Sequence, residues 1–443
     1  MSRRYTAEEA YDILAADSDA TDTASESGDE TVPDTAGPSV VSAKSLDLAH
    51  DAGDWEPLND FTPDNPLFTG SPGIQLDVTN YSALDFMQQF FGDDILGDIV
   101  TKTNLYAVQY LTLDDQSLIA RQGSWYPTSV PELKKFGTLT MLMGIIKKKK
   151  KNSIRMYWSK NSVCSTPIYS QTMNRSRYEA MLRFLHNSKC PPRDNPQYDN
   201  LYKIRPLISH FNRQFGSMYT PQKNICVDES LMNYKGRLGF KQYIPVKRSR
   251  YGIKLYKLCE SASGYVYTFR VYEGKDSHLD PPGCPDIIGM SGEIVWDLIN
   301  PLLNKGYHLF IDNYYNSIPL LRILYCFETV ACGTIRKTRV GFPKALAQKK
   351  LKRGETTALC QDELQALKFK DKKEVFMLTS MHTERTRRVT VCGRQEIRRV
   401  PVCIRRYNKH MGGVDLSDQL LQSYLILRKT RAWYKSLAFT LCK

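Results

Sequence analysis

Two short apolar runs, each ended by an aspartate, determine the expected fold: Ile225-Cys226-Val227-Asp228 and Leu309-Phe310-Ile311-Asp312. Short apolar runs bounded by polar residues are typical of buried strands. A carboxylate at the carboxyl end of such a strand faces the crevice where open α/β sheets bind ligands. The two runs therefore predict an α/β fold with Asp228 and Asp312 at one edge of a sheet.

Further β-rich segments and helical patterns surround these runs. The β-rich segments span 224–228, 253–259, 265–272, 308–312 and 329–335, and the helical patterns span 291–304 and 317–327. The order is three strands, a helix, a strand, a helix and a strand. We therefore expect a mixed α/β sheet over residues 221–335, with a hairpin-like start.

The chain before this sheet has an acidic part and a helical part. Residues 1–60 carry 15 Asp and Glu against 3 Lys and Arg, with few aromatic or branched residues, so we expect 1–66 to be a disordered acidic tail. Apolar residues at helical spacing begin at Ser82 and return over 130–146 and 175–185. Residues 67–220 are therefore expected to form a mainly helical domain.

The chain after the sheet changes character twice. Residues 336–410 hold 21 Lys and Arg against 7 Asp and Glu, a net charge of +14, and predict a basic insertion domain rather than more sheet. A last helical pattern begins near Gly412 and runs to Lys443, which predicts one final helix within 411–443.

The net charge of +14 conceals an asymmetry, because the first 60 residues carry −12 and the remainder therefore +26. A basic body with an acidic tail fits a protein that binds a polyanion, and nucleic acid is the favoured partner. The alternative is a solvated basic face without a specific partner.

Other protein classes find little support in the composition. No stretch approaches 18 consecutive apolar residues, and no basic segment followed by an apolar block opens the chain. These features argue against a membrane span and a secretory signal. The 11 cysteines contain no C-x-x-C pair, so a disulfide scaffold and a zinc finger within this chain are not expected.

Four aspartates are candidates for chemistry: Asp228, Asp312, Asp415 and Asp418. The last two lie at i and i+3 and share one helix face. Gathered carboxylates repel one another unless a cation joins them, and oxygen-only ligands favour Mg²⁺ or Mn²⁺. Two such ions about 4 Å apart can activate an attacking oxygen and stabilise a leaving one. Alternatively, Asp228 caps a turn, Asp312 begins one, and Asp415 is an ordinary helix N-terminal charge.

Several long motifs around these aspartates resemble the piggyBac family of DNA transposases. The first block is Val227-Asp228-Glu229-Ser230-Leu231, continued by Gln242-Tyr243-Ile244-Pro245 and Gly252-Ile253-Lys254-Leu255-Tyr256. The second is Phe310-Ile311-Asp312-Asn313-Tyr314-Tyr315-Asn316-Ser317. The third is Met411-Gly412-Gly413-Val414-Asp415-Leu416-Ser417-Asp418-Gln419. The likeness covers roughly residues 67–443.

The resemblance implies an RNase H-like (retroviral integrase-like) catalytic core, interrupted by the basic insertion. It implies that Asp228, Asp312 and Asp415 are catalytic and, with Asp418 beside the third, hold two Mg²⁺ or Mn²⁺ ions. The implied activity is cut-and-paste DNA transposition. Water attacks the transposon end, the freed 3′ hydroxyl forms a hairpin, and the resolved end joins a TTAA target. The alternative is a domesticated, transposition-inactive nuclear DNA-binding protein.

Basic residues near the first two strands are expected to contact phosphates: Lys247, Arg248, Arg250, Lys254 and Lys257. Arg336 and Arg339 match family positions implicated in target DNA contact. The interleaved Tyr243, Tyr251 and Tyr256 either stack on exposed bases or pack in the core. Such phosphate contacts predict an affinity for DNA that falls steeply with salt.

The resemblance also implies partners and a location. Double-stranded DNA, a homodimer that pairs two DNA ends, no membrane and a nuclear location are expected. Most relatives add a cysteine-rich zinc module after the last helix, whereas no close cysteine pair occurs here, so no zinc is expected in this chain. A run of five lysines, Lys147–Lys151, is either a solvated loop or a contribution to nuclear import.

Overall fold

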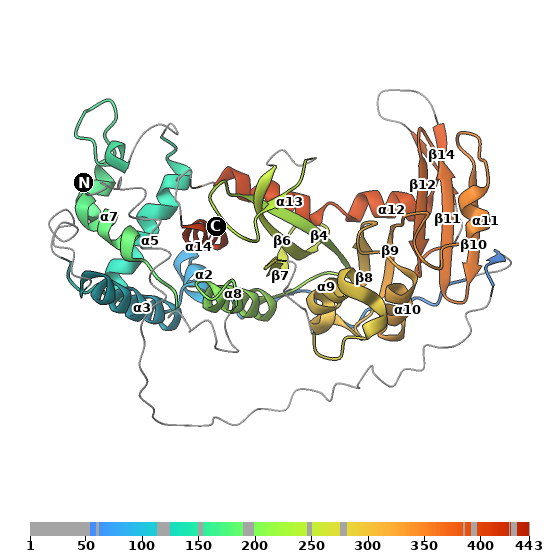
Figure 1. Ribbon diagram of the computed structural model, residues 1–443, viewed down its shortest axis with the longest axis horizontal. Helices are drawn as coiled ribbons and strands as arrows, with labels where there is room; N and C mark the ends of the chain where they lie inside the picture. Colours follow the sequence, from blue (N-terminus) through green and yellow to red (C-terminus); the bar gives the residue numbers. More distant parts are fainter. Residues whose placement is uncertain are drawn as a thin grey trace, which may run out of the picture.

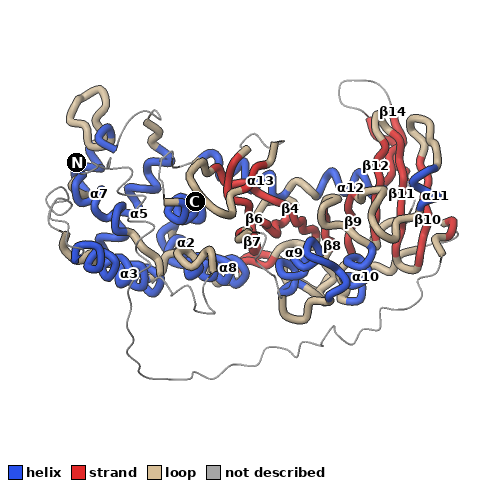
Figure 2. The backbone as a smooth tube through the Cα atoms, viewed as in Figure 1, coloured by secondary structure: helices blue, strands red, loops and turns tan. Residues whose placement is uncertain are grey.

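The structure is a computed structural model of the 443-residue chain. It describes residues 54–58, 62–112, 125–148, 154–188, 199–245, 250–274, 281–383, 386–390, 397–424, 426 and 432–442. The molecule is elongated, with helices of the first half at one end and a long sheet running to the other end (Figure 1). Figure 2 shows the same division, with helices in blue and strands in red.

Helices form the first part of the chain. They are α2 (Ala83–Phe90), α3 (Asp93–Thr112), α5 (Val130–Ile145), α6 (Pro167–Thr172), α7 (Arg175–Phe184) and α8 (Arg205–Met218), with a short 3₁₀ turn, η2 (Ile154–Met156). The helix expected from Ser82 begins with a capping box, in which the Ser82 hydroxyl and the Asp85 carboxylate each satisfy a backbone N–H of the other residue. The helices expected over 130–146 and 175–185 are confirmed as α5 and α7.

The centre of the sheet follows the order expected from the sequence. Strands β4 (Asn224–Asn233), β6 (Tyr251–Glu260) and β7 (Val266–Val271) are antiparallel neighbours, and β5 (Gln242–Tyr243) pairs with β6. Strands β8 (His308–Ile311) and β9 (Val330–Thr334) then add in parallel beside β4. Two helices, α9 (Gly289–Ile299) and α10 (Ile318–Cys326), with the 3₁₀ turns η3 (Asp286–Ile288) and η4 (Asn300–Leu302), lie in the connections.

The basic segment after residue 335 corrects one expectation, because it contains more of the same sheet. Strand β12 (Glu374–Thr379) pairs with β9, and β11 (Leu364–Lys370) and β10 (Thr356–Gln361) extend the sheet beyond it. The segment also contributes a short helix, α11 (Lys344–Gln348), and a separate ribbon of β13 (Thr386–Thr390) and β14 (Ile397–Pro401). We call β10, β11 and β12 the sheet extension.

The predicted acidic tail falls mostly outside the described residues, but its last part is described and forms specific contacts. Strand β1 (Glu56–Pro57) pairs with β10 at the far edge of the sheet. The Trp55 side chain donates a hydrogen bond to the carbonyl of Gly341 at 3.0 Å. A second short pair, β2 (Gly73–Ile74) with β3 (Tyr219–Thr220), follows. The tail therefore ends earlier than residue 66.

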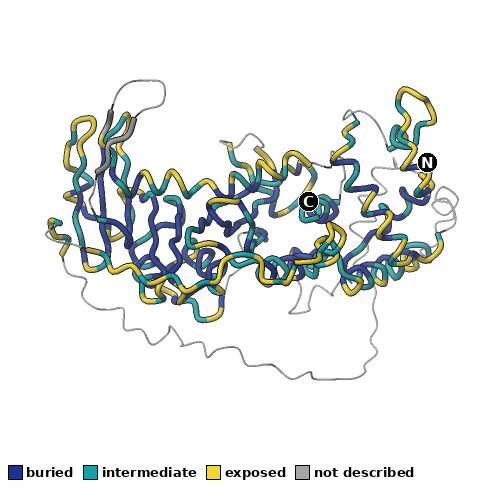
Figure 3. The backbone as a smooth tube through the Cα atoms, turned by 180° about the vertical axis from the view of Figure 1, so that it is seen from behind, coloured by how far each residue is buried: buried dark blue, intermediate teal, exposed yellow. Residues whose placement is uncertain are grey.

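The two faces of the central sheet are covered by different elements. Ile225, Val227 and Ile311 belong to a large apolar core with residues of α9 and α10. Helices α12 (Val402–His410) and α13 (Gly413–Ser423) contact β4 on the opposite face. Figure 3 shows that buried backbone is concentrated in the strands between these layers.

The single final helix expected within 411–443 was wrong. Helix α13 ends at Ser423, and a second helix, α14 (Trp433–Leu441), follows after Ala432. Helix α14 packs against the helical part of the molecule, where the Lys435 ammonium donates to the carbonyls of Leu182 and Arg183. Among the described residues, no helix combines the length and apolar character needed to cross a bilayer.

Candidate active site

Asp228 and Asp312 lie side by side in the sheet. Strands β4 and β8 run parallel, and their register pairs Val227 with Ile311. The next residue of each strand is the aspartate, so the two carboxylates follow directly paired positions. This register agrees with the expectation that the two aspartates are neighbours, but the expectation that both end their strands was wrong for Asp228. Asp312 follows the last residue of β8, whereas β4 continues past Asp228 to Asn233.

Both aspartates belong to the face that α13 covers. Cys226 and Phe310 share a core cluster with Val414 of α13, and the Ser230 hydroxyl binds Asp418 of the same helix. Because side chains alternate along a strand, residues 228 and 312 are on this face as well. The glycine at the start of α13 permits this close approach, because a Cβ at Gly413 would lie 2.8 Å from the Cys226 sulfur.

The third motif places its two aspartates differently. Asp415 is exposed in the first turn of α13. Asp418, one turn later, points to the sheet, where its Oδ1 atom accepts hydrogen bonds from Ser230 Oγ and Lys257 Nζ, both at 2.7 Å. Asp418 is therefore engaged within the protein, whereas Asp415 is open to solvent.

Lys257 corrects an expectation from the sequence. Phosphate contact was predicted for it, but its side chain is buried, with 5% of its surface exposed, and it forms an ion pair with Asp418. It also donates to the Ser417 hydroxyl at 3.4 Å. In the β4–β6 register, Lys257 is the cross-strand partner of Asp228. The ammonium thus lies among the predicted site residues and does not project into solvent.

Asp312 is partly buried and lies near another acidic side chain. Its Oδ1 accepts a hydrogen bond from the backbone N–H of Tyr314 at 2.9 Å. Burial, with a contribution from the negative charge of Glu229, raises the pKa of Asp312. Burial also raises the pKa of Tyr407 to about 12, helped by the charges of Asp312 and Asp228. Glu229 belongs to the first motif, but the sequence alone did not predict that its charge acts on Asp312.

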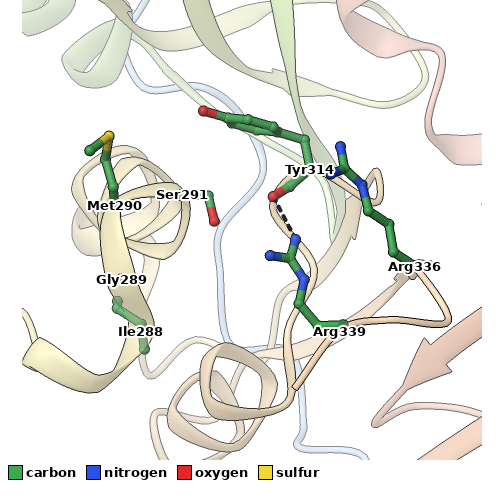
Figure 4. Close-up of a pocket in the computed structure, with 7 residues that line it drawn as sticks. All are labelled: Ile288, Gly289, Met290, Ser291, Tyr314, Arg336 and Arg339. Carbon is green, nitrogen blue, oxygen red and sulfur yellow. Dashed lines mark hydrogen bonds between the residues drawn. The ribbon is translucent and has the colours of Figure 1, made fainter. Parts of the chain in front are cut away.

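The two arginines after β9 brace the loop that follows Asp312. Arg339 Nη2 donates to the carbonyls of Asn313 and Tyr314, both at 2.9 Å, and Arg336 Nε donates to Asn313 Oδ1 at 3.2 Å. These arginines and Tyr314 line a hollow that is closed on its other side by Ile288 and the start of α9 (Figure 4). Burial and the neighbouring Arg336 lower the pKa of Arg339.

The other predicted DNA-binding residues are scattered. Lys254 Nζ lies 4.6 Å from the ring centre of Tyr256 and 4.9 Å from that of Tyr314, so it lies beside the loop after Asp312. Arg250 is exposed just before β6. Lys247 and Arg248 lie outside the described residues. Tyr256 is a core residue, whereas Tyr243 and Tyr251 are about half exposed.

The side chains at the candidate site have the chemistry that a hard divalent cation prefers, but their arrangement fits such an ion only in part. Asp228 and Asp312 provide adjacent carboxylate oxygens, the ligands that Mg²⁺ and Mn²⁺ prefer. Within the described ranges, however, no three His, Cys, Asp or Glu side chains are grouped closely enough to hold a metal ion. Asp418 is additionally held by Lys257.

Comparisons with known proteins agree with the motifs. A family model described as Transposase IS4 matches residues 82–443. The human PiggyBac transposable element-derived protein 3 is 26% identical over 368 residues, which cover 80% of this chain and 58% of that protein. The human PiggyBac transposable element-derived protein 2 is 27% identical over 409 residues, which cover 85% of this chain and 62% of that protein.

A solved structure matches as well. A chain of the piggyBac transposase synaptic complex with hairpin DNA superposes with a TM-score of 0.70 and 25% sequence identity, covering 84% of this chain and 75% of that chain. The present chain thus spans 58% to 62% of the length of the two curated relatives. The family model, the relatives and the structure agree, and the chain belongs to the piggyBac-type Transposase IS4 family.

Proposed function

We propose that the chain contains the catalytic core of a piggyBac-like DNA transposase that cleaves and joins DNA by cut and paste at TTAA targets. One observation carries the proposal, namely the register that pairs Val227 with Ile311 and so sets Asp228 beside Asp312. Family membership supports the reaction class. The solved relative is a complex with hairpin DNA, which supports DNA as the substrate.

The proposed core is RNase H-like and comprises β4, β6, β7, β8 and β9 with α13. Three antiparallel strands followed by two parallel strands support this assignment. Helix α13 contacts β4 and β6, so it brings the third motif to the face that carries Asp228. The domain limits proposed from the sequence are 67–220 for a helical DNA-binding and dimerisation domain and 336–410 for the insertion.

Asp228, Asp312 and Asp415 are the proposed ligands of Mg²⁺ or Mn²⁺. When bound, these ions would activate the attacking oxygen and stabilise the leaving one in phosphodiester transfer. The chain's own residues orient this site. Arg339 and Arg336 fix the Asn313–Tyr314 loop through hydrogen bonds, and the Tyr314 N–H orients the Asp312 carboxylate.

The same proposal extends to partners and location. The basic charge outside the acidic first 60 residues suits double-stranded DNA, with Lys247, Arg248, Arg250, Lys254, Arg336 and Arg339 as proposed phosphate contacts. A homodimer would pair two DNA ends, and the nucleus is the compartment where such DNA is found.

A second candidate function is a domesticated nuclear DNA-binding protein without transposition activity. One observation favours it, namely that the described residues hold no ready cluster of three metal-binding side chains. It predicts DNA binding without strand cleavage.

The test is a cleavage and joining assay with the purified full chain. The substrate is a duplex that carries piggyBac-like inverted repeats, the target is a plasmid with TTAA sites, and the metal is Mg²⁺ or Mn²⁺. We expect nicking and strand transfer from the wild type and a loss of at least ~100-fold in Asp312→Asn, since a carboxylate ligand is removed.

A matched control variant is Asp362→Asn. Asp362 is a half-exposed carboxylate in the turn between β10 and β11, where it pairs with Arg322. Its activity should equal that of the wild type. Tight DNA binding with no nicking in either metal would reject the transposase proposal in favour of the second candidate.

A further inference from the structure

We propose that buried Lys257 holds Asp418 as its counter-ion, so that Asp418 anchors α13 to the sheet and is not a metal ligand. The part of this proposal that concerns metal rests on the proposed function. The anchoring part stands on the geometry alone.

The Lys257 ammonium is buried, so its charge needs a partner within the protein. Lysine is almost never buried unless its charge is paired, and only 5% of Lys257 is exposed. Its Nζ is 2.7 Å from Asp418 Oδ1 and 3.4 Å from Ser417 Oγ. Both partners belong to α13, whereas Lys257 belongs to β6. One buried side chain thus joins the helix to the sheet.

Asp418 is held from a second strand as well. The oxygen that Lys257 binds also accepts a hydrogen bond from Ser230 Oγ of β4 at 2.7 Å. Two strands therefore hold the same carboxylate oxygen through two short bonds. A divalent cation on this carboxylate would lie next to the ammonium, and the repulsion between like charges would oppose its binding.

Lys257 lies where its positive charge can balance the negative charges of the proposed site residues. It is the cross-strand partner of Asp228, on the face that α13 covers. Its charge offsets part of the repulsion among the carboxylates that family members gather at this place. In addition, Ser417 and Asp418 lie two and three residues after Asp415, so anchoring them fixes the turn of α13 that presents Asp415.

The proposal predicts different results from the interpretation of Asp418 as a fourth metal ligand. If Asp418 binds metal, removing its charge weakens metal binding. If Lys257 holds Asp418 as its counter-ion, removing both side chains leaves metal affinity almost unchanged, because their charges cancel, while removing Lys257 alone frees a carboxylate and strengthens metal binding.

The experiment measures Mn²⁺ affinity by isothermal titration and melting temperature by calorimetry. The variants of the full chain are Asp418→Asn, Lys257→Met and the double variant. We expect the double variant to bind Mn²⁺ within about threefold of the wild type and Lys257→Met to bind about tenfold more tightly, whereas Asp418→Asn should bind more weakly, because its unpaired ammonium repels the cation. Asp418→Asn should melt lower, because it leaves the buried charge of Lys257 unpaired, and Lys257→Met should melt lower by less, because Asp418 is 28% exposed. The double variant should recover most of the loss seen in Asp418→Asn.

Lys368→Met serves as the matched control, because Lys368 is also a buried lysine of the sheet but lies in β11. It should melt lower without any change in Mn²⁺ affinity. If either single variant fails to fold, the double variant still decides, since it removes both charges together and should retain the wild-type affinity. A loss of Mn²⁺ affinity in the double variant as large as that in Asp312→Asn would overturn the proposal.

The outcomes also separate this proposal from the proposed function. A wild type that binds no Mn²⁺ contradicts the metal centre, but the melting temperatures then still test the anchor. Recovery in the double variant supports the Lys257–Asp418 pair, whereas additive losses of the two single variants reject it.

Discussion

The central strands and the sheet extension each contain a buried lysine, and the two lysines have different partners. Lys257 of β6 pairs with the side-chain carboxylate of Asp418. Lys368 of β11 is 1% exposed and donates to the backbone carbonyls of Ala347 and Lys349, at 3.0 and 2.7 Å, as well as pairing with Glu374. The same residue type is buried twice in one continuous sheet.

The partners of the two lysines indicate that the central strands carry the candidate site, whereas the sheet extension has a structural role. The carbonyls around Lys368 belong to the segment at the end of α11, so the lysine fastens that segment to the sheet. The carboxylate bound by Lys257 lies beside the residues that we propose as metal ligands. We therefore expect changes in the central strands to alter activity and changes in the extension to alter stability.

The largest expected effect is on DNA cleavage. Asp228→Asn removes a proposed ligand of the central strands and should lower the cleavage rate at least ~100-fold. Asp371→Asn removes a half-exposed carboxylate that pairs with Arg353 beside the extension and should leave the rate unchanged. Both cleavage rates are measured on the duplex used in the cleavage assay. Equal losses in the two variants would contradict the claim that only the central strands carry the site.

The next effect is on stability. Lys368→Met leaves two backbone carbonyls without their donor and should lower the free energy of unfolding by about 2–3 kcal/mol. Urea unfolding followed by circular dichroism measures the change. The double variant Lys257→Met/Asp418→Asn should lose much less, because both members of its buried pair are removed. An unchanged free energy of unfolding in Lys368→Met would mean that the stability of the sheet extension does not depend on this lysine.

A pH effect is expected where the two regions meet. Burial, assisted by charges that include Lys223 and Arg406 beside His308 and Arg406 beside His382, lowers the pKa of both histidines to about 3. The unfolded chain takes up these protons near pH 6.5 and the folded chain does not, so stability falls as pH decreases from about 6.5 towards 3. Each histidine should cost about 2 kcal/mol at pH 5.

The matching variant is His308→Gln, which removes one of these titrating groups. Its Gln side chain retains an oxygen that can accept from Arg406, as His308 Nδ1 now does at 3.0 Å. Unfolding free energies at pH 7 and pH 5 should then differ less than in the wild type. An unchanged pH dependence would show that His308 does not remain neutral in the folded protein.

The smallest effect concerns the arginines at the hollow. Arg339→Gln frees the Asn313–Tyr314 carbonyls and should lower cleavage about tenfold through poorer orientation of Asp312. Arg353→Gln, at the exposed edge of the extension, should leave cleavage intact and at most reduce the salt dependence of DNA binding by one phosphate contact. Fluorescence anisotropy at several salt concentrations, together with the cleavage assay, separates the two results.

The central fold could be predicted because its signals are local. Apolar runs such as 225–227 and 309–311 mark buried strands, and the aspartates that follow them become neighbours once the strands are parallel. The runs do not reveal that β4 continues past Asp228 to Asn233. The sheet extension escaped prediction because net charge dominated its interpretation. Its strands are in fact apolar enough for Leu364, Leu367 and Leu378 to be fully buried, while many of its lysines lie in the intervening loops.

The candidate site could be predicted only in part, because a local sequence pattern does not reveal which elements far apart in the chain pack against each other. Alternation along β6 separates Lys254 from Lys257, but it does not reveal that α13 covers the face of Lys257. The helical periodicity after Gly412 likewise continued past Ser423, where α13 ends. In both cases the missing information was which element packs opposite the residue.

The central claim is that Asp228, Asp312 and Asp415 share a divalent cation. The most direct measurement is an anomalous difference map from crystals of the full chain soaked in Mn²⁺. Our account predicts a peak bounded by the carboxylates of these three residues, with Asp418 still bound to Lys257. The absence of a peak at Asp228 and Asp312, or a peak that draws Asp418 away from Lys257, would contradict it.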